Sequence, residues 1–310
     1  MFDRSYDSKV RIAAFDWLTD LVMRYGDVLS REPLARGFFF DDKRVPLVGP
    51  QGIFKPRILE FPLSITTAPE GPYHDSIGPD NLLRYRYRGI DPNHRDNRGL
   101  RGAMSRQLPL AYFYGVAPSR YVAAWPAFIV GDNFDPIAPT FSVAVDDKSH
   151  LFVNSEDHNY QGSVGEEAGT TRREYITSAV RIRLHQRAFR ERVLEAYRRQ
   201  CAFCRLRHVE LLDAAHIIPD SDPEGEPVVT NGISLCNLHH AAFDRFFLGL
   251  RPDYRIEVRP DILREGDGPT LRHAIQGLQG MTILLPRKLE HRPDPALLAK
   301  RYELYLAAAK

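Results

Sequence analysis

Apolar positions recur at helical spacing near the start of the chain. Between residues 10 and 26 they fall every three or four residues, which predicts an amphipathic helix, and a short second helix is predicted at 31–36. The pattern then changes to short aromatic or β-branched runs separated by Gly, Pro, Asn and Asp. These runs are 38–40, 45–48, 58–65, 82–87, 110–116, 121–130 and 140–145. They predict a compact, largely antiparallel β domain.

A polar, Gly-rich stretch without sustained periodicity follows the β runs and predicts a linker. Beyond it, arginines surround an apolar stripe, which predicts a helix from residue 185 to just before the first cysteine. The C-terminal part predicts a strand pair near 254–258, a helix at 271–280, a strand at 281–285 and a final helix at 293–308. We therefore expect an α+β protein with a β domain at 1–150, a linker at 151–180 and a second domain at 181–310.

Composition narrows the class of protein. The chain has 310 residues, enough for two cores, and its 43% hydrophobic and 26% charged residues are ordinary for a globular protein. Its net charge is only +2, so a nucleic-acid surface must be a local patch. No apolar run has the length of a membrane span, and the start of the chain is charged. We expect a cytoplasmic protein that does not enter the membrane.

All three cysteines and four of the eleven histidines lie within residues 201–244. Cys201 and Cys204 have the CxxC spacing with which one tight turn can direct two thiolates at one metal ion. Cys236 and His239 repeat this spacing with an imidazole as the fourth donor. The sequence therefore predicts a closed, structural Cys3His zinc site, and it argues against a disulfide scaffold.

A second set of polar residues remains in the same stretch. His216 lies in an apolar run that predicts a strand, and Asn231 lies in a turn before the next run. His240 and Asp244 are four residues apart, so on a helix both would lie on one face, where they could share a divalent cation.

The order of these motifs, CAFC, AHIIP, NGISLC and then a helix, resembles the HNH family of nucleases with the ββα-metal fold. The resemblance implies that His216 is the general base, which takes a proton from the attacking water. It implies that Asn231 positions this histidine or the metal shell, and that His240 is a ligand of the catalytic Mg2+ or Mn2+ ion.

Two carboxylates are candidates for the remaining metal ligand. Asp244 stands where some HNH members carry a further metal-binding histidine. Many members also carry Asp or His directly before the first histidine, whereas this chain has Ala215 there and Asp213 two residues earlier. Sequence spacing alone does not decide which of the two carboxylates binds the catalytic metal ion. Asp244 could instead be a solvated helix residue or the ion-pair partner of Arg245.

These residue types suit phosphodiester hydrolysis. The reaction needs an activated water and a cation that stabilises the charge developing on the phosphate and the leaving oxygen. A neutral imidazole can activate the water at physiological pH, and a hard cation prefers oxygen and nitrogen ligands to thiolates. The alternative from the zinc motif alone is a structural zinc knuckle without catalysis, which would require neither His216 nor Asn231.

The β domain contains a second candidate site in residues 71–104. Tyr73 and Asp75 lie in a Gly/Pro loop, and Tyr85 and Tyr87 share one face of a predicted strand. The arginines of that strand, which could hold phosphates, share the opposite face: Arg84, Arg86 and Arg88. Aromatic rings beside a carboxylate suit a pocket for an extruded base.

The order of Tyr73, Asp75, Gly78, Tyr87, Gly89 and the stretch 97–100 resembles an SRA domain, a family of PUA-like barrels that read modified cytosine. The resemblance implies that Tyr73 and Tyr87 stack on the base and that Asp75 faces its Watson–Crick edge. The alternative is a β domain with tyrosines in its core and arginines on its solvated face.

A base-reading β-barrel domain followed by a zinc-stabilised HNH domain resembles the modification-dependent restriction endonucleases. This resemblance implies an HNH DNA endonuclease with structural Zn2+ and catalytic Mg2+ or Mn2+, acting on double-stranded DNA that carries 5-methylcytosine or a related base. Because one HNH core cuts one strand, we expect a homodimer. Two alternatives remain: an HNH enzyme that reads unmodified sequence or N6-methyladenine, and a zinc-braced, non-catalytic DNA-binding protein.

Overall fold

The computed structural model describes residues 3–68, 82–146, 166–266 and 268–309. The chain divides into two compact units, Met1–Arg187 and Ala188–Lys310. The described part of the predicted linker, 166–180, belongs to helix α5 (Glu166–Ala196), which begins well before the predicted helix start. The two units are described separately below.

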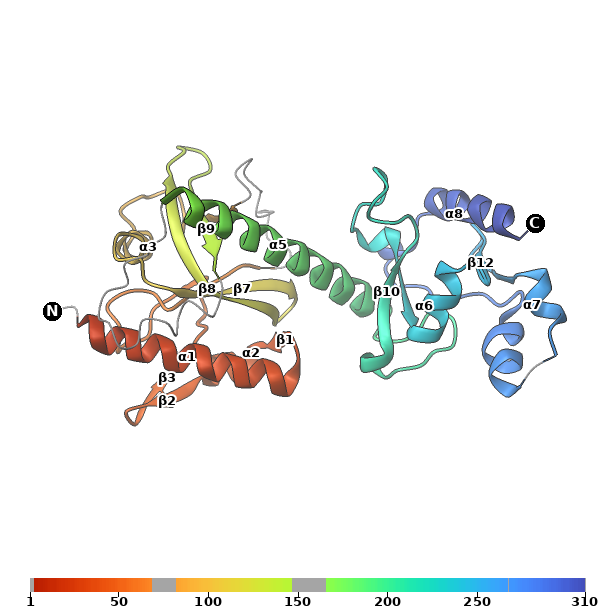
Figure 1. Ribbon diagram of the computed structural model, residues 1–310, viewed down its shortest axis with the longest axis horizontal. Helices are drawn as coiled ribbons and strands as arrows, with labels where there is room; N and C mark the ends of the chain where they lie inside the picture. Colours follow the sequence, from red (N-terminus) through yellow and green to blue (C-terminus); the bar gives the residue numbers. More distant parts are fainter. Residues whose placement is uncertain (1–2, 69–81, 147–165, 267, 310) are drawn as a thin grey trace. The chain divides into compact units, whose positions relative to one another are not determined.

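A seven-stranded sheet forms the centre of the first unit (Figure 1). Six strands follow the order β4-β5-β7-β8-β9-β6, and β1 pairs with β8 beside them; β5 and β7 are parallel and the other pairs are antiparallel. The described pairings do not join β4 to β6, so the sheet expected as a barrel is a curled half-barrel. Its strands are β1 (Val28–Ser30), β4 (Ile53–Phe54), β5 (Ser64–Thr66), β6 (Leu83–Arg86), β7 (Leu110–Ala117), β8 (Arg120–Asn133) and β9 (Thr140–Val145).

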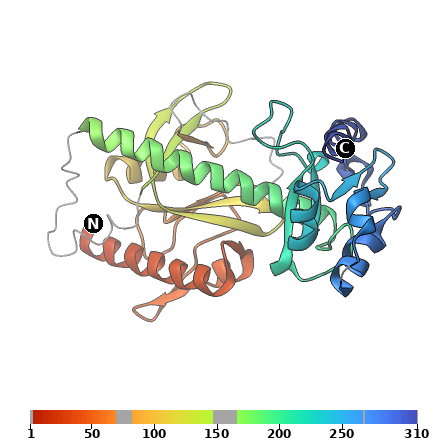
Figure 2. The same ribbon diagram turned by 45° about the vertical axis from the view of Figure 1, so that its right-hand side comes forward.

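Helices α1 (Arg4–Tyr25) and α5 cover opposite faces of this sheet (Figures 1 and 2). Helix α1 begins before the predicted apolar pattern because the side chain of Asp3 caps it, accepting a 3.0 Å hydrogen bond from the amide of Tyr6. Its buried face packs on strands β7 and β8 through Phe113 and Trp125. Helix α2 (Arg31–Arg36) and the hairpin β2 (Phe38–Phe40) to β3 (Lys43–Val45) complete the described structure near this face.

Helix α3 (Arg95–Ser105) was not predicted, because only Leu100 and Ala103 among its apolar side chains are fully buried. Its third buried residue is Asn97, whose amide nitrogen donates to the carbonyl oxygens of Arg88 and Asp91. This polar anchor fixes the chain that follows β6. A helix held in this way leaves little hydrophobic periodicity in the sequence.

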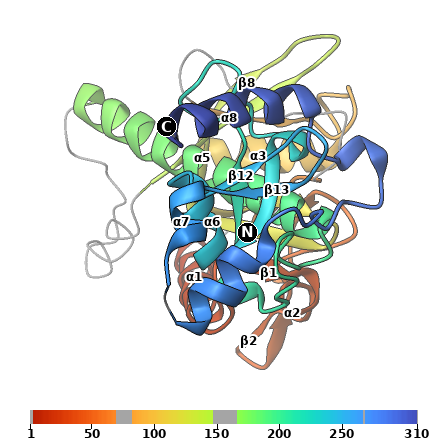
Figure 3. The same cartoon turned by 90° about the vertical axis from the view of Figure 1, so that its right-hand side faces the viewer.

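The second unit is built on a hairpin and a short helix. Strands β10 (Leu212–His216) and β11 (Gly232–Cys236) are antiparallel, and α6 (Asn237–Asp244) follows directly. A second hairpin of β12 (Leu248–Leu250) and β13 (Ile256–Val258) follows, and Figure 3 shows α8 (Pro295–Ala308) beside it. The shorter elements are η1 (Val209–Leu211), η2 (Val229–Asn231), α7 (Pro260–Arg264), η3 (Leu271–Ile275), η4 (Gln276–Leu278) and η5 (Leu289–His291).

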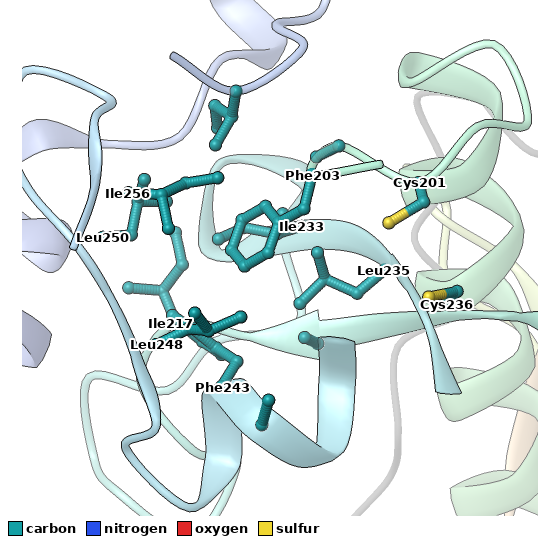
Figure 4. Close-up of a cluster of buried hydrophobic side chains, with 14 of the residues drawn as sticks. Cys201, Phe203, Ile217, Ile233, Leu235, Cys236, Phe243, Leu248, Leu250 and Ile256 are labelled. Carbon is teal, nitrogen blue, oxygen red and sulfur yellow. The ribbon is translucent and has the colours of Figure 1, made fainter. Parts of the chain in front are cut away.

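The core of the second unit lies between these hairpins and helix α6 (Figure 4). Ile233, Leu235 and Phe243 are each 0–1% exposed, and Cys201 and Cys236 lie at the edge of the same cluster. The strand predicted at 281–285 is reduced to a single bridge between Arg255 and Thr282. The core therefore joins the cysteine motif to the hairpin that carries His216.

Candidate functional site

The candidate catalytic residues lie on the ββα motif of the second unit. Strand β10 ends at His216, which is paired with Gly232 at the start of β11. A Cβ atom added to Gly232 would lie 2.4 Å from the Val193 side chain, so a side chain there would prevent α5 from packing against the hairpin. The other end of β11 delivers Cys236 to the start of α6. The two strands and the helix predicted from the sequence are confirmed.

Three sulfurs and one imidazole form a compact cluster. The Nδ1 atom of His239 lies 3.4 Å from Cys201 Sγ and 3.2 Å from Cys236 Sγ. Cys204 Sγ lies 4.0 Å from Cys236 Sγ, and all four donor atoms lie within 4.8 Å of one another. Tetrahedral zinc, with Zn–S of about 2.3 Å and Zn–N of about 2.0 Å, separates its ligand atoms by roughly 3.5–3.8 Å. The cluster therefore fits the predicted zinc site.

Neighbouring groups support zinc binding by this cluster. The Nε2 atom of His239 lies 2.7 Å from the carbonyl oxygen of Ala274, and donation to that oxygen leaves Nδ1 free to bind a metal. Hydrogen bonding with Cys201 raises the pKa of the Cys204 thiol and lowers that of Cys236. Three adjacent thiols therefore do not all ionise by themselves, and a bound dication would compensate their charge.

His216 is held against helix α5. Its ring stacks on that of Phe189, with centroids 4.1 Å apart and planes at 17°. Its Nε2 atom is buried and has no hydrogen-bond partner among the described residues. Burial lowers the pKa of His216, and the carboxylate of Asp220 acts in the opposite direction. The imidazole is therefore kept neutral near physiological pH, as a general base requires.

His240 lies between two carboxylates. Its Nδ1 atom is 3.7 Å from Asp213 Oδ2, and its Nε2 atom is 3.3 Å from Asp244 Oδ2. Both carboxylate side chains are about half exposed, at 49% and 54%. The charges of all three groups act on the pKa of His216, in addition to the effect of burial. This open set of nitrogen and oxygen donors suits a hard divalent cation.

The two carboxylates contact different nitrogens of the His240 ring. A cation bound to one ring nitrogen can therefore share only the carboxylate on that side, and the other carboxylate stays beside the opposite nitrogen. In this arrangement, Asp213 and Asp244 cannot both join His240 as ligands of a single ion.

Two arginines from helices outside the ββα motif lie beside these carboxylates. The Nε atom of Arg190, on α5, lies 3.3 Å from Asp213 Oδ1, and its Nη2 atom donates to the carbonyl oxygen of Leu212 at 2.7 Å. Arg301, on α8, is 6% exposed and lies 3.8 Å from Asp244 Oδ1. It also donates to the carbonyl oxygen of Phe243 at 2.9 Å, which ties α8 to the end of α6.

Asn231 is fully buried and uses its side chain on the loop that follows His216. Its Oδ1 atom accepts from the amide of Ile218 at 2.9 Å, and its Nδ2 atom donates at 3.0 Å to the carbonyl oxygens of Ile218 and Glu226. These contacts brace the loop between His216 and Asn231. They leave no described contact with His240 or the carboxylates.

The first unit contains a pocket of about 300 Å3 between the two edges of its sheet. It is lined from β4 and β5 by Gly52, Ile53 and Thr66, and from the β6 side by Tyr85 and Tyr87. The alternation predicted for this strand is confirmed, because its tyrosines are buried and its arginines are partly exposed. Tyr73 and Asp75 lie outside the described residues.

Tyr87 is fixed at the wall of this pocket. Its ring stacks on Phe141 at 4.4 Å and 18°, and its hydroxyl donates to Asp132. Arg101 donates to the same hydroxyl at 3.1 Å and to Asp132 at 2.6 Å. Burial, followed by the hydrogen bond to Asp132, raises the pKa of Tyr87, which therefore stays neutral.

The arginines beside Tyr87 have partners within the protein. Arg84 donates to the hydroxyl of Ser142, and Arg88 donates to Gln51 and Asp96. Arg86 and Arg88 also line the pocket. Two of the three arginines predicted to hold phosphates, Arg86 and Arg88, therefore lie at the pocket.

Comparisons with known proteins bear on the second unit. Residues 201–251 match the family model described as "HNH endonuclease", and this match covers the cysteine motif, the hairpin and α6. Residues 201–251 form an HNH endonuclease domain. The HNH endonuclease family consists of phosphodiester hydrolases, so the expected enzyme class is confirmed.

Solved structures resemble the chain only weakly. The "Modification dependent TagI restriction endonuclease" is 15% identical at a TM-score of 0.27, covering 78% of this chain and 80% of that chain. The "Type IV phosphorothioation-dependent restriction endonuclease ScoMcrA" is 12% identical at a TM-score of 0.21, and the match covers 79% of this chain and 50% of that chain. These TM-scores are too low to support a conclusion about function. No curated protein matches the chain's sequence.

The HNH domain contains the candidate catalytic residues and lies in the second unit, whereas the pocket lies in the first unit.

Within the described ranges, no helix combines the length and apolar character needed to cross a membrane.

Proposed function

We propose that the chain is a modification-dependent DNA endonuclease. In this proposal the first unit binds an extruded modified cytosine, or a related base, and the HNH domain hydrolyses a phosphodiester bond nearby. The observation that carries the proposal is the aromatic pocket of about 300 Å3 in the same chain as an HNH domain. A volume of this order is at the lower end of the range for small-molecule sites.

The catalytic roles follow from the contacts of the HNH domain. His216 takes a proton from the attacking water, because its ring is neutral and is oriented by Phe189. Asn231 keeps the ring in place through the loop that it braces. The product would carry a 5′-phosphate, as the resemblance to HNH nucleases implies.

His240 would hold the catalytic Mg2+ or Mn2+ ion. We assign Asp213 as its co-ligand on the Nδ1 side, because Asp213 lies on the same strand as His216. Asp244 would then accept the proton of Nε2 and orient the ring. When bound, the cation stabilises charge on the phosphate and on the leaving oxygen.

The pocket supports the base-reading part of the proposal. Tyr85 and Tyr87 line the pocket that would take an extruded base, and the exposed amide of Gln51 at the rim can donate and accept hydrogen bonds with a base edge. Tyr73 and Asp75, predicted to complete an SRA-like pocket in a PUA-like fold, remain part of this proposal. Arg84, Arg86 and Arg88 would lie near the flanking phosphates.

The test is digestion of matched duplexes that carry cytosine, 5-methylcytosine, 5-hydroxymethylcytosine or N6-methyladenine, each with Mg2+, Mn2+ or EDTA. We expect cleavage of duplexes with a modified cytosine, and none in EDTA. A Gln51→Ala variant should cut modified DNA more slowly at an unchanged melting temperature. Equal cleavage of modified and unmodified DNA would contradict base reading, and cleavage only with N6-methyladenine would move the specificity to that base.

One HNH domain cuts one strand, so a double-strand break requires two domains. We propose that two copies act together as a homodimer on double-stranded DNA. The dependence of the double-strand cleavage rate on protein concentration tests this, because a dimer loses double-strand cleavage before nicking when it is diluted.

A further inference from the structure

A cationic turn surrounds the first two zinc ligands. Residues 198–209 contain four arginines and no Asp or Glu. Three of these arginines, Arg198, Arg205 and Arg207, are exposed and form no ion pair or side-chain hydrogen bond with any described residue. We call these three residues the arginine turn.

Two members of the arginine turn hold the backbone in the left-handed region. The φ angle is 56° at Arg198 and 68° at Arg205. Glycine adopts this conformation without the steric conflict that a Cβ atom causes, and it is the usual residue just past a helix end, where Arg198 lies. Arginine is therefore an unfavourable choice for the backbone at both positions, unless its side chain has a function.

Arg199 shows how a left-handed arginine in this segment can be stabilised by partners within the protein. It is also left-handed, with a φ of 53°, but its guanidinium lies 3.2 Å from Glu191 and 3.1 Å from Glu195. The side chain of Arg199 thus stabilises the end of α5 from within the protein. Arg198 and Arg205 have no such partner among the described residues, so their exposed guanidinium groups are available to a ligand.

The arginine turn is rigidly joined to the catalytic hairpin. The amide of Arg205 donates to Cys201 O at 3.0 Å, and the amide of Cys201 donates to Leu206 O at 2.9 Å, which closes the turn. The amide of Ala202 then donates to Ser234 O at 2.7 Å, in the middle of β11. The main chain of this turn therefore has a fixed relation to the hairpin that ends at His216.

We propose that Arg198, Arg205 and Arg207 bind backbone phosphates of the DNA duplex that the HNH domain cleaves. Guanidinium groups pair with phosphate oxygens in a fork geometry, and such contacts fix the register of a duplex without reading its sequence. This inference rests on the proposed function only in taking DNA as the substrate, and it does not depend on base modification. It gives the zinc-binding turn a second task, which is to place the scissile strand.

The test uses full-length Arg198→Gly and Arg205→Gly variants. Glycine removes the guanidinium and relieves the left-handed backbone, so we expect melting temperatures equal to or above the wild type and unchanged zinc content. Affinity for an unmodified duplex, measured in EDTA-free buffer without Mg2+, should fall roughly tenfold for each variant. The slope of log K against log salt should become shallower by about 0.9 for each lost phosphate contact.

Three control variants separate the possible causes of weaker DNA binding. Arg205→Lys retains the charge and the strained backbone, so its salt slope should match the wild type. Arg287→Ala removes an exposed arginine elsewhere in the second unit and should leave affinity and slope unchanged. Arg199→Gly should lower the melting temperature, because it breaks the ion pairs with α5, while keeping the wild-type salt slope.

Unchanged affinity and slope in Arg198→Gly and Arg205→Gly would overturn the proposal. Weaker binding together with loss of zinc would also overturn it, because the arginines would then act through the cluster. Failure of the modification-dependent function leaves this test intact, since binding is measured on unmodified DNA. If the wild type cleaves modified DNA and the glycine variants cleave it equally well at high salt, the proposed role of the arginine turn is refuted. The proposed function of the protein is then unaffected.

Discussion

Two adjacent histidines on α6 belong to two chemically opposite sites. His239 is 1% exposed, its Nδ1 atom lies among three cysteine sulfurs, and its Nε2 atom lies 2.7 Å from the carbonyl oxygen of Ala274. The His240 side chain is 24% exposed and lies between two half-exposed carboxylates. The first site offers mostly buried, soft sulfur ligands, as zinc prefers, whereas the second offers solvent-accessible oxygen and nitrogen ligands, as a hard cation prefers. One helical step therefore separates a residue that we expect to be needed for folding from one that we expect to be needed for reaction.

The largest expected effect follows from breaking the closed site. His239→Ala should release zinc and unfold the second unit, because structural zinc sites contribute apparent binding free energies of about 10–16 kcal/mol. His240→Ala is the matched control and should retain both zinc and the fold. Zinc content and thermal unfolding measure the difference. A folded, zinc-loaded His239→Ala protein would contradict the assignment.

The next effect concerns the general base. His216→Ala should reduce single-turnover DNA cleavage by roughly 10²–10⁴-fold, the usual contribution of a positioned acid or base. Zinc content and DNA affinity should remain at wild-type values. Wild-type cleavage by this variant would place the base elsewhere.

A smaller effect distinguishes the two carboxylates. Asp213→Asn should weaken Mn2+ binding, measured by electron paramagnetic resonance without DNA, by more than tenfold if Asp213 is a ligand. Asp244→Asn removes the orienting partner of the ring and should cost roughly tenfold in cleavage rate. The reverse order in Mn2+ affinity would exchange the two roles and place the cation on the Nε2 side.

The smallest effect is on the pH dependence of cleavage. Burial lowers the pKa of His216, so its neutral form persists below the ordinary histidine value of about 6.5 and the rate should fall only at lower pH. The charge of Asp220 raises this pKa, so Asp220→Asn should shift the acid limb further toward low pH. Asp222→Asn, in the same loop, serves as the control. A shift toward higher pH would contradict the electrostatic account.

Motifs with short spacing were predictable from the sequence. The CxxC turn, the repeat at Cys236 and His239 and the i, i+4 pair of His240 and Asp244 are set by local geometry, and the structure brings each group together. The face of β6 that carries Tyr85 and Tyr87 was also predictable, because strand alternation needs only local sequence.

Contacts between distant segments were not predictable in this way. Phe189 and Arg190 reach the site from α5, and Arg301 reaches it from α8. Each of these residues looks like an ordinary part of an amphipathic or basic helix when it is read locally. Helix α3 was missed because a buried asparagine, rather than an apolar stripe, anchors it. Pairings of this kind depend on tertiary packing, which a single sequence does not encode by spacing.

The tight hold on Asn231 also protects the chain chemically. Asn231 precedes Gly232, and Asn–Gly pairs in unfolded chains are prone to ring closure and deamidation. In the folded domain the amide nitrogen is occupied by two carbonyl oxygens, and η2 and β11 fix the backbone on either side. We expect a zinc-stripped domain to lose this protection and to deamidate to an aspartate that lacks both donated hydrogen bonds, so storage without metal should lower activity irreversibly.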